Sequence, residues 1–410
     1  MTKESVSKES VSNEAAQAIL QHLRSRQTEI VALLTQCAEI ETPSAVPETL
    51  APQFELFQSE LEGLGFECVH TAGQKTGGEL LAVKSDVDKD SPRQMLLGHC
   101  DTVWPLGTLE TMPVQSRGGC LYGPGVYDMK GGLVQALFAL SAIRELGMKP
   151  SVSPVFFLNS DEEIGSFESV DTIRKLAPAV DRVMVMEPSL GPTGQLKTAR
   201  KGVGRFLVKV TGRAAHAGLD PDKGISAILE LSHVIQALFA LNDKERGVSV
   251  NVGTIHGGMR PNVIAPASHA EVDVRVRTQQ DADEVERVIL GLEPTVPGTE
   301  LTITGNIGRP PLERTPGNRM LWDRAVEAST ALELEISEGD AGGGSDGNWT
   351  SLYTPTLDGL GAVGDGAHAT NEHVIEDRMP ERAALLACLL LAPPIKAEPS
   401  PEAKAFWSNG

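Results

Sequence analysis

Three short apolar stretches, each followed by acidic or imidazole side chains, constrain the fold of this chain most strongly. They are residues 95–97, which lead to His99 and Asp101; 155–158, which lead to Asp161, Glu162 and Glu163; and 183–186, which lead to Glu187. A helix-like run, "GGLVQALFALSAIREL", lies between the first two. Apolar runs that alternate with helical patterns indicate βαβ units and a mostly parallel sheet. Because ligands bind at the carboxyl ends of such strands, we expect a site there.

The character of the chain changes between residues 201 and 311. "GVGRFLVKVTG", "VSVNVGTIHGG" and "HAEVDVRVRT" alternate as antiparallel strands do, and two amphipathic helical patterns accompany them. We therefore predict an α/β fold with a mixed, mostly parallel sheet and helices on both faces. Residues 15–200 and 312–410 would form this catalytic domain, with an α+β domain inserted at 201–311. Residues 1–14 are polar, repeat "KESVS", and are expected to be a mobile tail.

Composition excludes several classes of protein. With 36 basic and 55 acidic residues the net charge is −19, which disfavours nucleic acid and anionic membranes as partners. The longest apolar runs are far shorter than a membrane span, and the first residues contain no apolar segment of a secretory signal. Five cysteines, an odd number, fit a reducing compartment. We expect a cytoplasmic protein.

The acidic strand ends predict a metal site. Asp128 lies in "YGPGVYDMKGG", at the entry to the helix-like run. Taken singly, Asp128 could be a helix N-cap, His99 a buried core histidine and Glu187 a surface charge. Taken together, His, Asp and Glu side chains at successive strand ends favour zinc or a similar divalent ion with an open coordination position.

Seven motifs occur in an order that identifies a resemblance. They are "GHCDTV", "GPGVYDMKGG", "NSDEEIGS", "MEPS", "GRAAHAG", "RPNVIAP" and "GAHATNEHV". From about residue 30 to 390 the chain resembles the di-zinc aminoacylase/carboxypeptidase family, which includes glutamate carboxypeptidases, deacylases, desuccinylases and di- or tripeptidases. "GRPPLE" and the motif spacing look closest to the bacterial glutamate carboxypeptidase branch.

The resemblance implies two divalent ions, expected to be zinc, with cobalt or manganese as alternatives. Its implied ligands are Asp128 bridging the ions, His99 and Glu187 on one, and Glu163 and His368 on the other. Glu162 would be the general base acting on the bridging water, and Asp101 would fix the tautomer of His99. The peptide after Asp128 is often cis in this family. His373 competes with His368 in the motif and is expected at the surface.

The resemblance also implies that residues 201–311 serve as a lid and as the dimerisation surface of a homodimer. His216 would reach the partner subunit's active site and stabilise the oxyanion. Substrate carboxylates need arginine side chains or backbone N–H groups, and the candidates for holding them are Arg275, Arg309, Asn262 and the backbone of Gly343 and Gly344. From the residues alone, Arg275 could instead form a cross-strand ion pair with Glu271 or Asp273, and Arg277 alternates onto the same face.

The expected reaction is hydrolysis of a small peptide or acyl-amino acid that releases a C-terminal amino acid, glutamate first. A deacylase or dipeptidase would use the same residues. A serine hydrolase is a remote alternative, since "GGSDG" places Ser345 before Asp358 or Asp365 and then His368. The charged stretch 86–90 begins like a calcium loop but lacks the later residues of that motif. A non-enzymatic relative is a third alternative, and it would be expected to lack one of the di-metal ligands or the general base.

Overall fold

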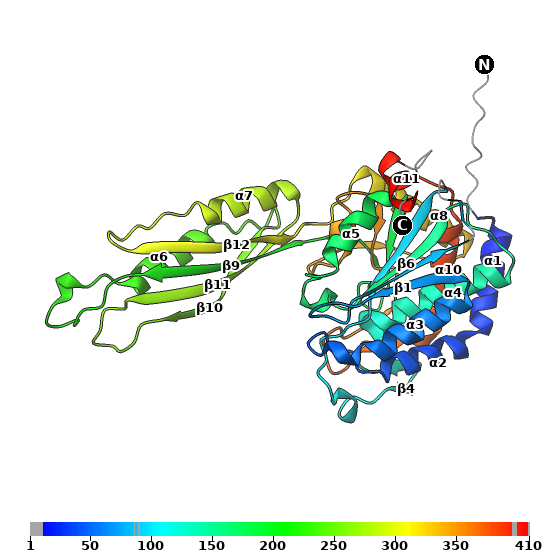
Figure 1. Ribbon diagram of the computed structural model, residues 1–410, viewed down its shortest axis with the longest axis horizontal. Helices are drawn as coiled ribbons and strands as arrows, with labels where there is room; N and C mark the ends of the chain where they lie inside the picture. Colours follow the sequence, from blue (N-terminus) through cyan, green and yellow to red (C-terminus); the bar gives the residue numbers. More distant parts are fainter. Residues whose placement is uncertain (1–10, 86, 89–90, 396–399, 409–410) are drawn as a thin grey trace, which may run out of the picture. The chain divides into compact units, whose positions relative to one another are not determined.

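The computed structural model describes residues 11–85, 87–88, 91–395 and 400–408, and these form two compact units (Figure 1). Unit 1 contains the described residues up to Thr198, residues 314–339 and those from Ser345 onward; unit 2 contains 199–313 and 340–344. Most of the tail predicted over 1–14, and part of the charged stretch 86–90, lie outside the described residues. The first helix begins at Asn13, so residues 13 and 14 are helical, which corrects the predicted end of the tail. Ser12 caps this helix by accepting a hydrogen bond from the Ala15 N–H.

Unit 1 is built on a six-stranded sheet with the order β1-β2-β6-β3-β7-β14. The strands are β1 (Phe66–Thr71), β2 (Glu79–Lys84), β3 (Arg93–His99), β6 (Ser153–Asn159), β7 (Arg182–Val185) and β14 (Thr356–Leu357). β6, β3, β7 and β14 pair in parallel, whereas β1 and β2 add antiparallel pairs at one edge. All residues of β3, β6 and β7 are buried, as the continuous apolar runs predict.

Helices cover both faces of this sheet. Leu96 belongs to the apolar core that includes α4 and α10, whereas its neighbours Met95 and Leu97 pack in a separate core with α5 and Trp349. Adjacent residues of one strand thus face opposite layers. The helices of unit 1 are α1 (Asn13–Ser25), α2 (Gln27–Ala38), α3 (Ala51–Gly63), α4 (Gly131–Glu145), α5 (Val170–Leu176), α8 (Pro316–Ala331), α9 (Gly347–Thr350), α10 (Met379–Leu391) and α11 (Pro401–Ser408).

Two smaller sheets fix loops beside the main one. The first has the order β15-β16-β5-β4 and pairs residues far apart in sequence. Its strands are β4 (Gln115–Arg117), β5 (Cys120–Tyr122), β15 (Gly364–Asp365) and β16 (His373–Ile375). This pairing holds the segment before Asp128 beside the segment after His368. The second sheet pairs β8 (Leu196–Arg200) with β13 (Glu338–Ala341).

Unit 2 is an antiparallel sheet with the order β10-β11-β9-β12 and two helices. Its elements are β9 (Gly202–Thr211), α6 (Ala227–Phe239), β10 (Ser249–Gly257), β11 (Ala267–Val276), α7 (Gln279–Leu290) and β12 (Glu300–Arg309). Buried and exposed residues alternate along β9 and β11, and the buried ones form one core with α6 and α7. Both helices therefore pack on one face of the sheet, and the other face presents the alternate residues. The α+β character expected of the insertion is confirmed.

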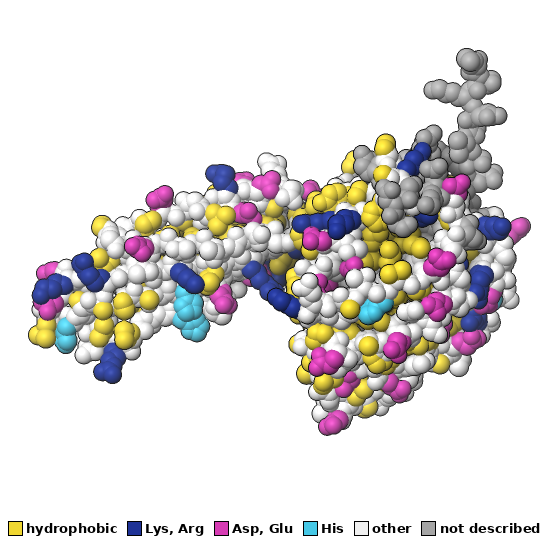
Figure 2. All heavy atoms as spheres, in the orientation of Figure 1, with side chains coloured by type: hydrophobic (Ala, Val, Ile, Leu, Met, Phe, Trp, Pro, Cys, Tyr) yellow, Lys and Arg dark blue, Asp and Glu magenta, His cyan; other side chains and the backbone are white. Residues whose placement is uncertain are grey.

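No helix in the described part of the chain is long and apolar enough to cross a membrane. On the face visible in Figure 2, acidic side chains are scattered over unit 1 with basic ones among them. The acidic excess is thus distributed over that surface rather than gathered in one patch.

Candidate metal centre

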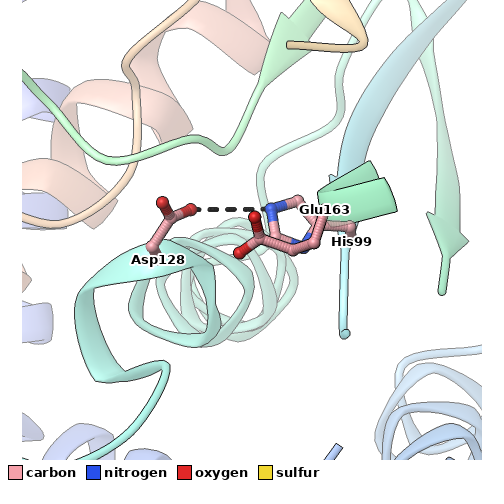
Figure 3. Close-up of side chains that lie close together, drawn as sticks. All are labelled: His99, Asp128 and Glu163. Carbon is pink, nitrogen blue, oxygen red and sulfur yellow. Dashed lines mark ion pairs between the residues drawn. The ribbon is translucent and has the colours of Figure 1, made fainter. Parts of the chain in front are cut away.

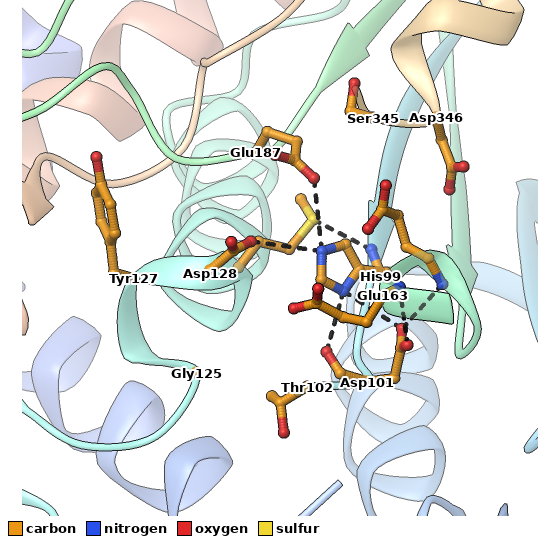
Figure 4. Close-up of polar contacts among 12 residues, drawn as sticks. His99, Asp101, Thr102, Gly125, Tyr127, Asp128, Glu163, Glu187, Ser345 and Asp346 are labelled. Atoms are coloured by element: carbon orange, nitrogen blue, oxygen red, sulfur yellow. Dashed lines mark hydrogen bonds and ion pairs between the residues drawn. The ribbon is translucent and has the colours of Figure 1, made fainter. Parts of the chain in front are cut away.

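The carboxyl ends of the central strands bring the predicted ligands together in unit 1 (Figure 4). His99 is the last residue of β3 and pairs in parallel register with Asn159, the last residue of β6. Glu162 and Glu163 follow three and four residues after Asn159, and Glu187 follows β7. Parallel strands end at one edge of a sheet, so the imidazole and the carboxylates meet there.

Asp128 lies between two histidines and turns one carboxylate oxygen toward each. Its Oδ1 atom is 3.5 Å from His99 Nε2, and its Oδ2 atom is 3.5 Å from His368 Nε2. Glu187 Oε1 is 3.5 Å from His99 Nε2, and Glu163 Oε2 is 3.2 Å from His368 Nε2. Figure 3 shows Asp128 facing the His99 ring, with the Glu163 carboxylate close beside that ring. The five side chains thus form two groups of three that share Asp128.

These spacings fit divalent ions. Ligand atoms about 2.0–2.2 Å from a tetrahedral zinc lie roughly 3.3–3.6 Å from one another, close to the separations between the side chains here. Two buried atoms of the cluster, His99 Nε2 and Glu163 Oε1, have no hydrogen-bond partner among the described residues. Buried polar atoms without a partner are costly, and ions bound by these side chains would satisfy both atoms.

Asp101 orients His99 for this task. His99 Nδ1 lies 3.0 Å from the Asp101 backbone carbonyl and 3.3 Å from Asp101 Oδ1, so the ring proton belongs on Nδ1 and the Nε2 lone pair faces Asp128 and Glu187. The Asp101 carboxylate also accepts hydrogen bonds from the backbone N–H groups of Glu162 and Glu163, at 3.3 and 3.2 Å. One fully buried side chain therefore links two neighbouring strand ends.

The cluster perturbs its own proton affinities. The carboxylates of Asp128 and Glu163 raise the pKa of His368 to about 10. Burial lowers the pKa of His99, but the surrounding carboxylates outweigh it and hold that pKa well above its usual range. Burial also raises the pKa of Glu163. Acidic groups held this close need compensating positive charge, which protons or metal ions can supply.

Glycines let the Asp128 turn approach the strand ends. A Cβ on Gly132 would lie 1.9 Å from the carbonyl oxygen of Met186, the residue before Glu187, so only glycine allows α4 this close to the end of β7. Gly125 adopts a left-handed φ of 73° at the start of the turn. The Asp128–Met129 peptide is cis, as the resemblance suggested.

Two supporting residues have no signal in the sequence. The Ser44 hydroxyl donates to Asp101 Oδ2 at 2.6 Å, and Lys197 Nζ lies 3.6 Å from Glu187 Oε2. Ser44 lies 57 residues before Asp101, so only the fold reveals that contact. His373, expected at the surface, lies partly exposed outside the cluster with its ring stacked on Tyr122.

The residues predicted to read the substrate all belong to unit 2. His216 Nδ1 accepts hydrogen bonds from the backbone N–H groups of Gly218 and Leu219, each at 3.1 Å. Its Nδ1 lone pair is therefore engaged, which places the ring proton of the neutral form on Nε2. The next residue, Ala217, donates its N–H to the carbonyl of Asn262 at 3.0 Å, so His216 and Asn262 lie on adjacent segments.

Arg275 and Arg309 lie opposite the same residue of the central strand β9 in the unit 2 sheet. Val203 of β9 pairs with Arg275 on one side and with Arg309 on the other. Paired residues point to the same face, so the two arginines leave the sheet together, with backbones about 10 Å apart. Arg275 makes a two-bond ion pair with Asp273, at 2.8 and 3.0 Å. Both residues lie on β11, so the pair forms within one strand and is not the cross-strand pair expected as the alternative.

Gly343 and Gly344 also belong to unit 2, and a side chain of the same unit holds their backbone. Arg200 Nη1 donates to the carbonyls of Gly343 and Gly344, at 3.3 and 3.0 Å. A Cβ on Gly344 would lie 2.6 Å from Arg309 Cδ, so glycine lets this backbone pack against that side chain.

Ser345 is not arranged as a serine nucleophile. It is fully buried, and its hydroxyl donates directly to Asp358 Oδ2 at 2.5 Å. A serine hydrolase needs a histidine to accept that proton. The histidine in question, His368, instead faces Asp128 and Glu163. The serine-hydrolase alternative loses its geometric basis.

Comparison with known proteins identifies the family of the chain. Residues 95–392, more than half of the chain, match peptidase family M20/M25/M40. The chain belongs to this family. It is 28% identical over 384 residues to carboxypeptidase G2 of Pseudomonas sp. (strain RS-16), covering 91% of both chains. It is 29% identical over 363 residues to a succinyl-diaminopimelate desuccinylase of Delftia acidovorans, covering 82% of this chain and 91% of the relative.

Solved structures of M20 relatives share the fold. An aminopeptidase from Bacillus cereus superposes with a TM-score of 0.75 at 18% identity, over 89% of this chain and 98% of that one. A dinuclear metal-binding M20 peptidase from Bacillus subtilis gives a TM-score of 0.67 at 14% identity, over 90% and 98%. The chain is thus a metal-dependent enzyme of a family of peptidases and amidohydrolases, with an α/β catalytic unit and an inserted second unit.

Proposed function

We propose that this protein is a di-metal hydrolase that cleaves an amide or peptide bond and releases a C-terminal amino acid, with glutamate favoured. The observation that carries the proposal is Asp128, whose two oxygens face two histidines at 3.5 Å, each histidine having a further carboxylate within 3.5 Å. His99, Glu187 and Asp128 would hold one ion, and His368, Glu163 and Asp128 the other. Zinc suits these nitrogen and carboxylate ligands, and cobalt or manganese could replace it.

Glu162 is the proposed general base. One ligand-type atom from each of His99, Glu162 and Glu187 lies within 4.8 Å of the others, so Glu162 borders the cluster without being needed to complete either set of three. Two bound ions would polarise the scissile carbonyl and acidify the attacking water. Glu162 then takes a proton from that water and delivers it to the leaving nitrogen. Its N–H is held by Asp101, which fixes the backbone from which the carboxylate projects.

His216 is proposed to act on the carbonyl oxygen of a substrate in a partner subunit. Its Nδ1 accepts two backbone N–H groups, so the neutral ring carries an Nε2–H that can donate to a developing oxyanion. A homodimer formed through residues 201–311 would bring this donor to the second copy. The compact, separately cored unit 2 supports that role.

Arg275, Asn262 and the Gly343–Gly344 backbone are proposed to hold the α-carboxylate, and Arg309 the side-chain carboxylate. The ion pair with Asp273 keeps the Arg275 guanidinium in one orientation, and Arg has five N–H donors, so others remain for a ligand. A fork of this kind suits carboxylates. The similarity to carboxypeptidase G2 supports this assignment, whereas the similarity to desuccinylases favours deacylation of acyl-amino acids as the second candidate.

The decisive experiment measures bound metal and hydrolysis on the same samples. Glu162→Gln should retain two metal ions and lose about 100- to 10,000-fold in kcat, the usual contribution of a general base. Asp128→Ala should lose metal as well as activity. A panel of N-acyl glutamate, aspartate, alanine and leucine identifies the leaving amino acid. Full activity of Glu162→Gln would refute its role, and full metal content in Asp128→Ala would refute the proposed centre.

A further inference from the structure

Glu372 is a buried carboxylate that the proposed chemistry does not use. It is fully buried, four residues after His368. Burial raises its pKa to about 7, against the hydrogen bonds donated to it, which lower that pKa. A buried carboxylate in this position needs a structural reason, because burying an acidic group is costly unless its oxygens are well bonded.

Four N–H groups supply those bonds. Glu372 Oε1 accepts from the backbone N–H groups of Tyr127 and Asp128, each at 3.0 Å. Glu372 Oε2 accepts from the Gly125 N–H at 3.0 Å and from the Trp104 indole at 2.8 Å. Three of the four donors therefore come from the turn that carries Asp128. Both oxygens are engaged twice, which is the full capacity of a carboxylate.

The contacts add to the hydrogen bonds that the turn makes within itself, from the Val126 N–H to the Gly123 carbonyl at 3.4 Å and from the Lys130 N–H to the Gly125 carbonyl at 3.0 Å. Gly125 has a φ of 73°, and the N–H groups of residues 125, 127 and 128 converge on one point rather than on the carbonyls of a helix. The backbone carbonyl of Glu372 also accepts from the Gly123 N–H at 3.3 Å. One residue thus fixes the turn from Gly123 to Asp128.

Glu372 and His368 approach Asp128 from two sides. His368 Nε2 faces the Asp128 carboxylate, whereas Glu372 holds the Asp128 amide. The short sheet beside them, in which His373 pairs with Tyr122, keeps the two segments in register. His368 itself has a left-handed φ of 60°, so its position depends on a tightly turned segment that Glu372 anchors.

We propose that Glu372 is a positioning residue of the metal centre, which sets the place and orientation of Asp128 through its three N–H contacts and couples that turn to the His368 segment. The proposal rests on the proposed role of Asp128 as a metal ligand. Groups that orient metal ligands typically contribute 10–100-fold in metal affinity.

The test substitutes Glu372→Gln, which preserves size and shape. A glutamine offers one carbonyl oxygen and one NH2 group, so two of the four N–H donors must face another donor. Metal affinity, measured by competition with a chelator, should fall by about 10–100-fold, and the visible absorption spectrum of the cobalt-substituted protein should change. A merely structural role would lower the unfolding midpoint of the metal-free protein and leave the cobalt spectrum of the folded protein unaltered.

Trp104→Phe is the matched control, since it removes one donor to the same carboxylate and leaves the three contacts to the turn. It should keep metal affinity within a few-fold and keep the cobalt spectrum. An equal loss in both variants, or wild-type affinity and spectrum in Glu372→Gln, would overturn the proposal. If Glu372→Gln does not fold, Glu372→Asp serves instead; its carboxylate is one methylene short, and unchanged metal affinity there would also overturn it.

Asp128→Ala separates the two levels of inference. If that variant still binds two ions, the proposed metal centre is wrong. If Asp128→Ala loses metal while Glu372→Gln binds both ions as the wild type does, only the positioning role of Glu372 is wrong.

Discussion

Replacing Ser345 with alanine should weaken the fold and spare catalysis. The Ser345 hydroxyl donates to Asp358 at 2.5 Å and accepts the Gly347 N–H at 3.1 Å, and both Ser345 and Asp358 are fully buried. Ser345→Ala removes a donor from a buried carboxylate and an acceptor from a buried N–H. A hydrogen bond to a charged group contributes about 1.5–3 kcal/mol, so unit 1 should lose roughly that much free energy of unfolding.

Urea denaturation and initial rates on the same preparation check this. The urea midpoint should fall at an unchanged slope, whereas kcat/KM and metal content should stay within about threefold of wild type. Ser141→Ala is the matched control, because the Ser141 hydroxyl also donates to a carboxylate, that of Glu145 at 2.7 Å, but at an exposed site. It should cost less than about 1 kcal/mol. A folded Ser345→Ala protein without turnover but with both metals would refute this reasoning and revive the serine nucleophile.

Three further predictions follow from the site. Arg309→Ala should reduce the preference for glutamate over leucine by roughly 10–150-fold, the value of one charge-assisted contact, whereas Arg275→Ala should impair all substrates; an unchanged preference in Arg309→Ala would contradict its role. Mixing inactive His216→Ala with inactive Glu162→Gln protein under subunit exchange should restore part of the activity, since one site of each heterodimer has both wild-type residues; no rescue despite proven exchange would exclude action across subunits. Neighbouring carboxylates raise the pKa of His368 from 6.5 to about 10. In the metal-free protein, the stabilisation from its positive charge is therefore fully present below about pH 6.5 and is lost as pH rises through about 10. The unfolding temperature of the metal-free protein should fall over that pH range, and its dependence on pH should be weaker in His368→Gln. Metal affinity should rise over the same range because the ion displaces the proton.

The sheet could be predicted because its central strands are buried on both faces. That burial demands continuous apolar residues in β3, β6 and β7, and the local pattern shows them directly. The alternation in β9 and β11 likewise follows from one covered face and one open face. The ends of helices were harder to predict. Residues 13 and 14 are polar, yet they belong to α1, which begins directly after its N-cap Ser12.

The expected metal ligands lie together, and Asp101 lies beside His99 as the resemblance implied, but three other supporting contacts could not be predicted. Ser44 contacts Asp101 across 57 residues and Glu372 contacts the Asp128 amide across 244, whereas Lys197 is close in sequence to Glu187. The hydrophobic pattern of the sequence indicates none of these contacts. The partner of Arg275 was open for a related reason. Asp273 and Glu271 both lie on its own strand and face, and only the side-chain conformations choose between them.

The Arg200 contacts have a consequence for how such enzymes diverge. Residues 340–344 are separated from 199–313 by an entire helix of unit 1, yet they belong to unit 2 and are held there by Arg200. If the inserted segment were exchanged between relatives, residues 340–344 would stay in the recipient chain and would contact the side chain that the donated segment has at position 200. A chimera with altered substrate preference would therefore have to inherit residues 340–344 together with the inserted segment, while the metal-binding sequence could stay as it is.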